Sequence, residues 1–342
     1  MIFPAADWQT ASPRSQGVDP RGLEDAVAYL REALAACGGI EEMAIIRHGR
    51  LLWQGTDIDR CHQIWSATKS FTSTVLGLLI DDGRCTLDTP AMDVVPALAE
   101  KYPGVKLRHL ATMTSGYDAV GGSYGDDPDD GSTTPYDPAE PLFAPGTMYR
   151  YWDDAQRLQG LVLTKIAGEP MQDLFSRRIA EPIGMTVCQW HVQAVVDGMI
   201  INDSAGTLKT TARQIARLGL LYLNRGRWEG RQLLSEAYVA EATRVHVPAD
   251  TPWDPTVSGR QARLDGRGVY GLNWWVNGVR PDGRRYWPAA PAATFKASGL
   301  MENVCFVIPD WQMVIARLST RPRPENMTAI WNTFFEKLGA AL

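Results

Sequence analysis

The sequence lacks several features that mark particular classes of protein. No apolar run approaches the roughly 20 residues that a membrane-spanning helix needs, and the N-terminus has neither the basic region nor the apolar stretch of a signal peptide. The net charge of −5 gives no sign of a nucleic-acid partner. We therefore expect a cytoplasmic protein with no membrane or nucleic-acid partner, although a chain trimmed of its leader would look the same.

Cysteine and histidine are also scarce. The five cysteines are widely spaced and never form C-x-x-C, so we expect them to be reduced and mostly packed inside the protein. The five histidines show neither H-x-x-x-H nor H-E-x-x-H spacing. The sequence therefore predicts no metal site, and nothing in it calls for a cofactor.

What is present is the composition of a globular protein. Hydrophobic residues make up 45% and charged residues 21% of the 342 positions, enough to bury a large core. Apolar spacing and turn residues predict helices over 20–37, 71–80, 149–167, 171–179, 212–224, 236–243 and 325–338. They predict strands over 43–46, 51–53, 270–277, 284–287, 294–298, 303–308 and 312–318.

Strands at both ends with helices between them indicate a mixed α/β (α+β) fold. We expect one antiparallel sheet, built from both termini, flanked by helices and interrupted by a helical insertion. The whole chain, 1–342, would be one catalytic unit. Residues 1–90 and 200–342 would form its α/β subdomain, and residues 91–199 its helical subdomain.

Ser66 and Lys69 form a Ser-x-x-Lys motif at the start of the most apolar helical run. Positions i and i+3 share one face of a helix, so the two side chains could meet. A serine hydroxyl is a weak nucleophile until a neighbour takes its proton, and a desolvated lysine can do so. By itself the motif favours a structural interpretation, a Ser N-cap followed by a solvated Lys.

Five further segments accompany this motif in a fixed order, and together they resemble the serine β-lactamase-like hydrolases. The resemblance is to the branch of class C β-lactamases, esterases and 6-aminohexanoate-dimer hydrolases, and it runs through most of the chain. With the Ser-x-x-Lys motif itself, the six segments are SATKSF at 66–71, LRHLATMTSG at 107–116, PGT at 145–147, YWD at 151–153, SAGTLKTTARQIAR at 204–217 and YGLNWW at 270–275.

The resemblance implies roles for particular residues. Ser66 would attack a carbonyl and form an acyl-enzyme, and Lys69 would accept its proton, directly or with Tyr151. A tyrosine is ordinarily neutral because its pKa is about 10, but a nearby ammonium would favour its ionised form and let it carry the proton to the leaving group. The oxyanion hole would consist of the backbone N–H groups of Ser66 and Leu300.

The chain departs from the family pattern at Asp153, where the family has Asn. An Asn side chain can donate a hydrogen bond to a substrate amide, whereas an ionised Asp can only accept one. Beside Lys69, the carboxylate would also favour the protonated lysine, which is a poorer base. A structural Asp153 that turns away from the site is the alternative.

The second departure is Ala297-Ser298-Gly299, where the family has Lys or His before x-Gly. Lys296 comes one residue earlier and would point to the opposite face of a strand. Since the family's cation helps to hold the carboxylate of a penicillin, its absence favours esters or amides without that carboxylate. A shift of one residue in register would restore Lys296 to the site.

Other candidates receive a structural interpretation. G-x-S-x-G at 121–125 would make Ser123 a nucleophile only between a strand and a helix, and a loop follows instead. The acidic residues 126–130 are interpreted as a solvated turn, and Thr211 as a helix cap. Trp152 could line an apolar acyl pocket or simply pack. The arginines of the helix at 212–224 and beyond are expected to form a solvated face: Arg213, Arg217, Arg225, Arg227 and Arg231.

Three functions remain open at this stage. The first is an esterase or amidase with a small-molecule substrate. The second is a β-lactamase or penicillin-binding activity. The third is an acyltransferase or a silenced ligand-binding member. The sequence gives neither the natural substrate nor the oligomeric state.

Overall fold

The computed structural model describes residues 1–123, 131–257 and 261–342, and its centre is a six-stranded antiparallel sheet. The sheet strands are β1 (Met43–Arg47), β2 (Arg50–Gln54), β9 (Trp275–Val276), β10 (Phe295–Gly299), β11 (Asn303–Ile308) and β12 (Met313–Arg317). Their order is β2-β1-β12-β11-β10-β9. The N-terminal β1 thus pairs with the C-terminal β12, which confirms a sheet built from both ends of the chain.

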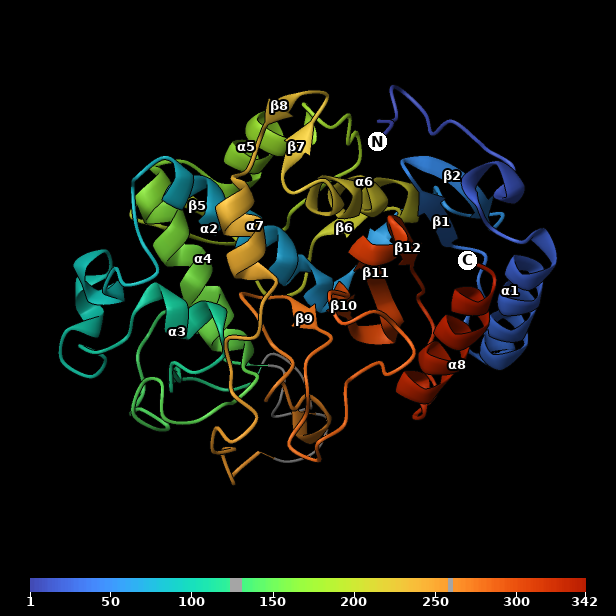
Figure 1. Cartoon of the computed structure of the whole chain (residues 1–342). Helices are drawn as coiled ribbons and strands as arrows, with labels where there is room; N and C mark the ends of the chain where they lie inside the picture. The colour runs from blue at the N-terminus through green and yellow to red at the C-terminus, as the bar shows by residue number, and fades with distance from the viewer. Residues whose placement is uncertain (124–130, 258–260) are drawn as a thin grey trace.

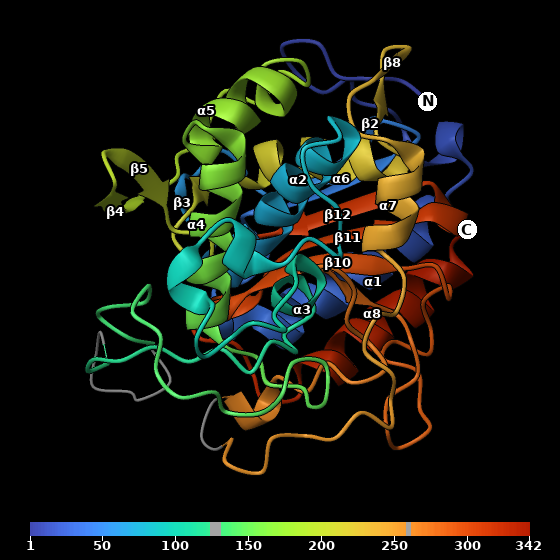
Figure 2. The ribbon, with the colours of Figure 1, turned by 90° about the vertical axis from the view of Figure 1, so that its left-hand side faces the viewer.

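Helices cover both faces of this sheet (Figures 1 and 2). They are α1 (Pro20–Leu34), α2 (Thr68–Asp81), α3 (Leu107–Ala111), α4 (Asp153–Ala167), α5 (Met171–Phe175), α6 (Ala212–Leu223), α7 (Glu236–Ala242) and α8 (Met327–Ala340). The blue α1 and the red α8 lie side by side on one face, and α2 and α6 lie on the other (Figure 2). A π-helical turn, Ser176–Ala180, continues α5.

Three two-stranded ribbons complete the fold. They are β3 (His62–Gln63) with β6 (Lys209–Thr210), β4 (Val192–Val196) with β5 (Met199–Asn202), and β7 (Arg227–Trp228) with β8 (Arg231–Gln232). The first ribbon joins the segment before α2 to the segment before α6, with His62 opposite Thr210. It therefore brings two distant parts of the chain together beside the start of α2.

The sheet separates two hydrophobic cores because successive side chains of a strand point to opposite faces. In β11, Cys305 and Val307 enter the core with α2 and α6, whereas Phe306 and Ile308 enter the core with α1 and α8. Every residue of β11 is buried, so neither face of this central strand meets solvent. The sheet is thus a middle layer, as expected for a mixed α/β fold.

Several predicted elements differ from the structure. The helix expected over 149–167 begins only at Asp153, and Trp152 before it is extended. The strand expected over 270–277 is reduced to β9, because Tyr270 bridges to Trp275 across a tight turn in which Asn273 has a φ of +59°. Residues 284–287 form only an isolated bridge, between Arg285 and Val279. The other predicted helices and strands are present within a few residues of the expected bounds.

The expected solvated face of arginines is wrong for Arg217. This side chain is fully buried, and its guanidinium donates to the carbonyls of Pro4, Ala5, Ala6 and Ile183. Burial lowers the pKa of Arg217. Arg213 is bound as well, to Asp59 and Asp7. The arginines beyond the helix are exposed, as predicted: Arg225, Arg227 and Arg231.

The structure also bears on the cysteines and on membrane-spanning helices. All five cysteines are free, but Cys61 is exposed instead of packed. Among the described residues, no helix is both long and apolar enough to cross a bilayer.

Candidate active site

Ser66 lies in a short 3₁₀ turn, Trp65–Ala67, that leads directly into α2. The turn is fixed on both sides: the Ile64 N–H donates to the Leu208 carbonyl at 2.9 Å, and the Thr68 N–H donates to the carbonyls of Trp65 and Ser66. Trp65 adopts a left-handed φ of +51°, a strained conformation that is typical of functional sites. Ser66 is therefore held at the N-terminal end of a buried helix, where the helix dipole favours negative charge.

Lys69 lies one turn further along and is buried, with 1% of its side chain exposed. Its Nζ donates to Ser66 Oγ at 2.9 Å, to Asp153 Oδ1 at 2.8 Å and to the Ala205 carbonyl at 2.8 Å. An ammonium has three N–H groups, so these three acceptors use all of them. The i, i+3 spacing thus brings the two residues of the Ser-x-x-Lys motif together.

The same geometry suits proton transfer. A neutral amine has two N–H groups and one lone pair. With the two N–H groups on Asp153 and the Ala205 carbonyl, the lone pair faces Ser66 Oγ, 2.9 Å away. That distance is within hydrogen-bond reach for a general base.

Asp153 is the first residue of α4, and it turns toward Lys69 instead of away from it. Its side chain is 26% exposed, so the ion pair lies at the edge of the buried region. The structural alternative for Asp153, with the carboxylate pointing away, is therefore wrong. Trp152 precedes it and is 8% exposed; its indole N–H donates to Asp118 Oδ1 at 3.1 Å, and the Arg150 guanidinium lies over its ring.

Tyr151 lies above Lys69, with Nζ 4.9 Å from the centre of the phenol ring. The ring is 5% exposed and stacks on Trp275 at 6.0 Å, while Tyr270 meets it edge-on at 6.2 Å. Burial raises the pKa of Tyr270 well above its ordinary value, so this neighbour stays neutral. Tyr151 thus lies between the Lys69 ammonium and the packed rings of Trp275 and Tyr270.

The end of β10 closes the other side of the serine turn. A Cβ on Gly299 would overlap the Ile64 carbonyl oxygen and lie 2.9 Å from the Ala67 nitrogen, so only glycine allows this approach. Leu300 follows, at the start of a 3₁₀ turn, Leu300–Glu302. The expected oxyanion residues Ser66 and Leu300 therefore belong to two segments in contact.

Lys296 points to the opposite face of β10 from Ala297. Ala297 is buried in the core with α2, whereas Lys296 pairs with Glu302 at 3.3 Å and lies over the rings of Trp287 and Phe306. The register is therefore the one expected from the sequence, and Lys296 is not beside Ser66. Ser298 is half-buried and pairs with Val304 on β11.

The other candidate motifs lie elsewhere. Ser123 forms an isolated bridge with Ser132, and residues 124–125 of its motif and the acidic residues 126–130 lie outside the described residues. Thr211 caps α6 by accepting from the Gln214 N–H at 3.2 Å. Throughout the part of the chain that the structure describes, no three His, Cys, Asp or Glu side chains gather as a metal site would require.

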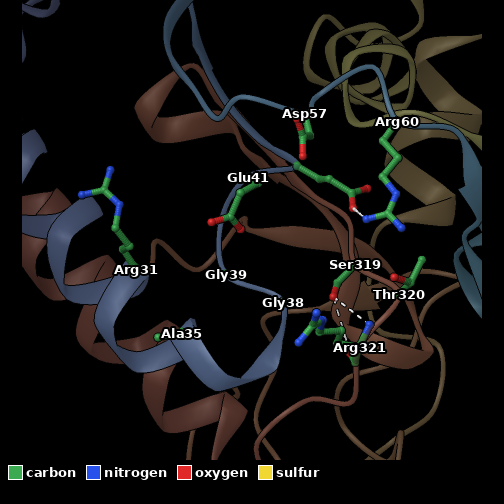
Figure 3. A pocket seen from close by; sticks show the side chains of 11 residues that line it. Arg31, Ala35, Gly38, Gly39, Glu41, Asp57, Arg60, Ser319, Thr320 and Arg321 are labelled. Carbon is green, nitrogen blue, oxygen red and sulfur yellow. Dashed lines mark hydrogen bonds and ion pairs between the residues drawn. The ribbon is translucent and has the colours of Figure 1, made fainter.

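A cavity of about 390 Å³ opens between α1 and the segment after β12 (Figure 3). Its lining is polar and carries charges of both signs, including Arg31, Asp57 and Arg321. Ser66, Lys69 and Tyr151 do not line it. The cavity is therefore distinct from the candidate active site.

Sequence reasoning missed two kinds of contact at the site. The Ala205 carbonyl, which accepts from Lys69, is a backbone group that no side-chain pattern reveals. Asn273 donates to Gln156 Oε1 at 2.7 Å, and its carbonyl accepts from Ser70 Oγ at 2.9 Å, which joins the segment before β9 to α2 and α4. Both residues lie in segments that carry the family resemblance, but the sequence gives no sign of these contacts.

Comparison with known proteins identifies the family. The sequence profile described as Beta-lactamase matches residues 30–334. The chain belongs to the beta-lactamase family. This is a family of serine hydrolases that includes β-lactamases, esterases and aminohexanoate-dimer hydrolases.

Two curated relatives match this beta-lactamase family member over very different shares of their length. A "Beta-lactamase" of Pseudomonas fluorescens is 28% identical over 124 residues, which are 36% of this chain and 35% of the relative. A "Penicillin-binding protein 4" of Amycolatopsis lactamdurans is 23% identical over 336 residues, 91% of this chain and 75% of the relative. The match thus spans about a third of the first relative and three quarters of the second.

Solved structures show the same fold at low identity. A Bacillus anthracis protein assigned as a 6-aminohexanoate-dimer hydrolase has a TM-score of 0.72 at 18% identity, over 98% of this chain and 86% of that one. EstCE1, described as a hydrolase with promiscuous acyltransferase activity, has a TM-score of 0.67 at 17% identity, over 93% of this chain and 98% of that one. A penicillin-binding protein homologue from Caulobacter crescentus has a TM-score of 0.67 at 18% identity, over 95% of this chain and 99% of that one.

Proposed function

We propose that this protein cleaves an ester or amide bond through an acyl-enzyme on Ser66, with Lys69 and Tyr151 as general base and acid. The observation that carries the proposal is the 2.9 Å hydrogen bond between Lys69 Nζ and Ser66 Oγ, with the lysine side chain only 1% exposed. Membership of a serine hydrolase family supports it.

The proposed reaction has two halves. Ser66 Oγ attacks the carbonyl carbon while its proton moves to the neutral amine of Lys69, and the N–H groups of Ser66 and Leu300 bind the developing oxyanion. The bond to the leaving group then breaks, and the proton passes from Lys69 through Tyr151 to the leaving group, which leaves Lys69 neutral again. In the second half, water attacks the acyl carbon and gives its proton to Lys69. The bond to Ser66 Oγ then breaks, and that proton returns to Oγ as the acid leaves.

The charges around the site favour a substrate without a carboxylate at the position of the family's cation. Lys296 faces the other side of the sheet, and Ala297 brings no charge. The charge of Lys69 is matched by Asp153, so this pair leaves no net cation for an anionic group. We therefore propose neutral esters or amides as the substrate class.

The test is hydrolysis of a short-chain p-nitrophenyl ester by the wild type and by Ser66→Ala, with a chromogenic cephalosporin in parallel. We expect ester turnover that is lost in Ser66→Ala, and slow or absent cephalosporin turnover. Full activity in Ser66→Ala would overturn the assignment of Ser66 as the nucleophile. Cephalosporin turnover that exceeds ester turnover would favour the β-lactamase or penicillin-binding alternative, for which the Pseudomonas relative is the supporting observation.

The remaining alternatives have their own signatures in this assay. An acyltransferase would pass the acyl group to an added alcohol or amine, which product analysis detects. A silenced binding protein would hold an ester without turning it over. The hydrogen-bonded Ser66 and Lys69 argue against silencing, because a binding protein has no chemical need for this pair.

A further inference from the structure

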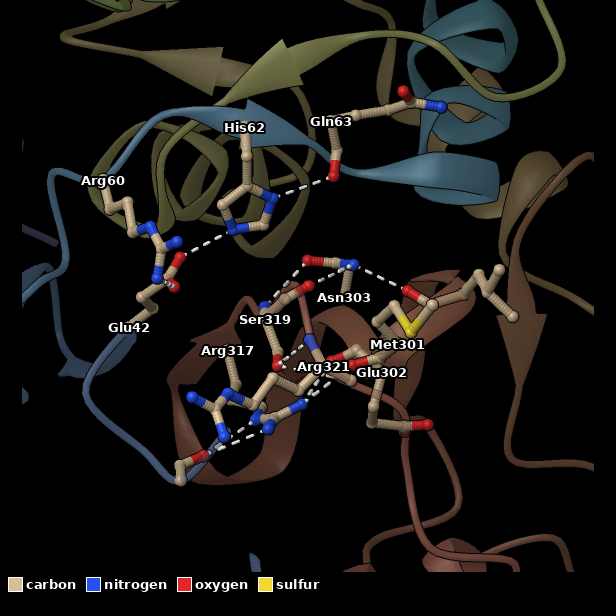
Figure 4. Close-up of polar contacts among 12 residues, drawn as sticks. Glu42, Arg60, His62, Gln63, Met301, Glu302, Asn303, Arg317, Ser319 and Arg321 are labelled. Carbon is tan, nitrogen blue, oxygen red and sulfur yellow. Dashed lines mark hydrogen bonds and ion pairs between the residues drawn. The ribbon is translucent and has the colours of Figure 1, made fainter. Parts of the chain in front are cut away.

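We propose that Asn303 is a positioning residue that holds the oxyanion-binding turn Leu300–Glu302 in a strained conformation, and that Arg317 supports it. The inference rests on the proposed function, since it concerns the N–H group of Leu300. The two residues lie on β11 and β12, outside the reacting groups (Figure 4).

The turn itself is unfavourable for the residues that form it. Met301 has a φ of +61° and Glu302 a φ of +60°, in the left-handed region that residues with a Cβ avoid. Two such residues in succession persist only where surrounding contacts force them. A turn of this kind, directly after the proposed oxyanion residue Leu300, indicates that its shape is selected for function.

Asn303 is fully buried and connects the turn to Ser319. Its Nδ2 donates to the Leu300 carbonyl at 2.6 Å and to the Ser319 carbonyl at 3.1 Å, while its Oδ1 accepts from the Ser319 N–H at 3.0 Å. The Leu300 carbonyl is thereby fixed to the start of β11 and, through Asn303, to the segment that follows β12. On its other side, Leu300 follows Gly299, which is pressed against the serine turn. Both flanks of Leu300 are thus fixed, and the proposal requires that its N–H is thereby held toward Ser66.

Arg317 binds the next two carbonyls of the same turn. Its Nη1 donates to the carbonyls of Met301 and Glu302 at 3.0 and 3.2 Å, and its Nε and Nη2 donate to the carbonyl of Gly39. The side chain is 1% exposed, so these bonds are not exchanged with water. The three carbonyls of the turn are thus all bound by Asn303 or Arg317.

The test compares Asn303→Asp with Asn277→Asp. The first change keeps the size and the acceptor for Ser319 but replaces the donor to Leu300 with a carboxylate, which repels that carbonyl. Asn277 is a matched control, because it is 1% exposed and its Nδ2 also donates to backbone carbonyls, those of Trp287, Ala290 and Pro291. Both variants should lower the melting temperature, and only Asn303→Asp should affect catalysis.

For Asn303→Asp we expect kcat for a p-nitrophenyl ester to fall by about tenfold to a hundredfold, with KM within about twofold, because an oxyanion donor acts in the transition state. Affinity for a boronic acid, which mimics the tetrahedral adduct on Ser66, should fall with kcat. The ratio of variant to wild-type kcat should rise as the pH is lowered, since a protonated carboxyl can again donate to Leu300. Asn277→Asp should keep the wild-type kcat.

Unchanged kcat in a folded Asn303→Asp would overturn the inference, and so would an equal loss of kcat in Asn277→Asp. If Asn303→Asp does not fold, Arg317→Lys, which keeps the charge but loses the paired bonds to Met301 and Glu302, must show the same kcat loss. Ser66→Ala separates the two proposals. Ester turnover that survives in Ser66→Ala refutes the nucleophile, whereas Ser66-dependent turnover with an insensitive Asn303 refutes only the positioning role.

Discussion

Lys69 carries the central chemistry at the scale of single residues. A buried ammonium is costly unless its N–H groups are bonded and its charge is matched, and here Ser66, Asp153 and the Ala205 carbonyl meet both needs. The same arrangement limits the base, because Lys69 Nζ is held in an ion pair with Asp153 at 2.8 Å. The replacement of the family's Asn by Asp is therefore the residue change with the clearest chemical consequence.

Asp153→Asn should increase ester turnover near neutral pH. Without the carboxylate, Lys69 Nζ loses the ion pair at 2.8 Å that holds it beside Asp153, so it is freer to accept the Ser66 proton and kcat/KM should rise. A pH–rate profile of both proteins measures this increase. Asp197→Asn, which removes a surface partner of Lys165, is the control and should leave the profile unchanged. A profile that does not move in Asp153→Asn would contradict the role given to Asp153.

The pair of His62 and Glu42 should make stability depend on pH. Burial lowers the pKa of His62, but three effects together outweigh burial and raise that pKa above its ordinary value: the hydrogen bond to the Glu42 carboxylate at 2.6 Å, the hydrogen bond to the Gln63 carbonyl and the negative charge of Glu42. The protonated form is thus favoured in the folded state, so its stabilisation is complete below about pH 6.5, the ordinary value, and is lost as the pH rises through the raised pKa.

Urea unfolding between pH 5 and 9 measures this contribution. The free energy of unfolding should decline across that window in the wild type, and His62→Gln should make the decline smaller. The exposed His191 gives the control, since His191→Gln should leave the decline in the free energy of unfolding unchanged. An identical decline in wild type and His62→Gln would show that the pair contributes nothing.

Sequence reasoning reached some site residues and not others, for physical reasons. Ser66 and Lys69 could be paired because helix geometry fixes the distance between i and i+3. Tyr151 came only from the resemblance, since nothing local distinguishes it from a packed aromatic. The roles of the Ala205 carbonyl and of Asn303 depend on backbone groups brought close by the fold, which no local pattern contains.

At the scale of elements, the contact between β10 and the serine turn decides the shape of the site. Gly299→Ala would force a Cβ against the backbone of Ile64 and Ala67, so β10 must retreat from the turn. We expect a loss of about 2 kcal/mol in the free energy of unfolding, as for other overpacked sites. The ester kcat should also fall, because Leu300 retreats with β10.

Chemical unfolding and ester kinetics on the same preparations check this prediction. Gly104→Ala is the control: a methyl group there would only touch the Pro145 ring at 3.7 Å, so stability and kcat should stay near the wild type. Wild-type kcat in a folded Gly299→Ala would show that the distance between β10 and the turn is unimportant for catalysis.

Elements with a strong local signal were predictable, and those formed by distant contacts were not. Helix α1 has both an Asp19 cap and a regular apolar stripe, and it lies where expected. The segment before β9 has the composition of a strand, but the Asn273 N–H donates to the Ala111 carbonyl, and that distant contact turns the chain. Residues 149–152 are likewise held extended by distant contacts. The Tyr149 N–H donates to the Pro252 carbonyl, and the Arg150 N–H donates to the Met113 carbonyl.

At the scale of the whole molecule, one sheet divides two cores, and both ends of the chain contribute to it. The N-terminal segment before α1 is bound by Arg217, whose guanidinium reaches three of its carbonyls. This buried cation therefore connects the first residues of the chain to α6 and, through Ile183, to the end of the helical region.

Arg217→Gln should destabilise the protein without changing its chemistry. The lost charged hydrogen bonds leave buried carbonyls unpaired, which costs about 3 kcal/mol. Hydrogen exchange should show faster exchange in residues 1–8, and the ester kcat of the folded protein should stay the same. Arg231→Gln, at an exposed position, is the control. Unaltered exchange in residues 1–8 would contradict the role of Arg217 in holding the N-terminal segment.

The central claim is that Ser66 is the nucleophile, activated by Lys69. The most direct measurement is intact-protein mass spectrometry after treatment with a fluorophosphonate, followed by peptide mapping. The account predicts one adduct, on Ser66, that is absent in Ser66→Ala and forms far more slowly in Lys69→Ala. An adduct on another residue, such as Ser123, or equal labelling of Ser66→Ala, would contradict it.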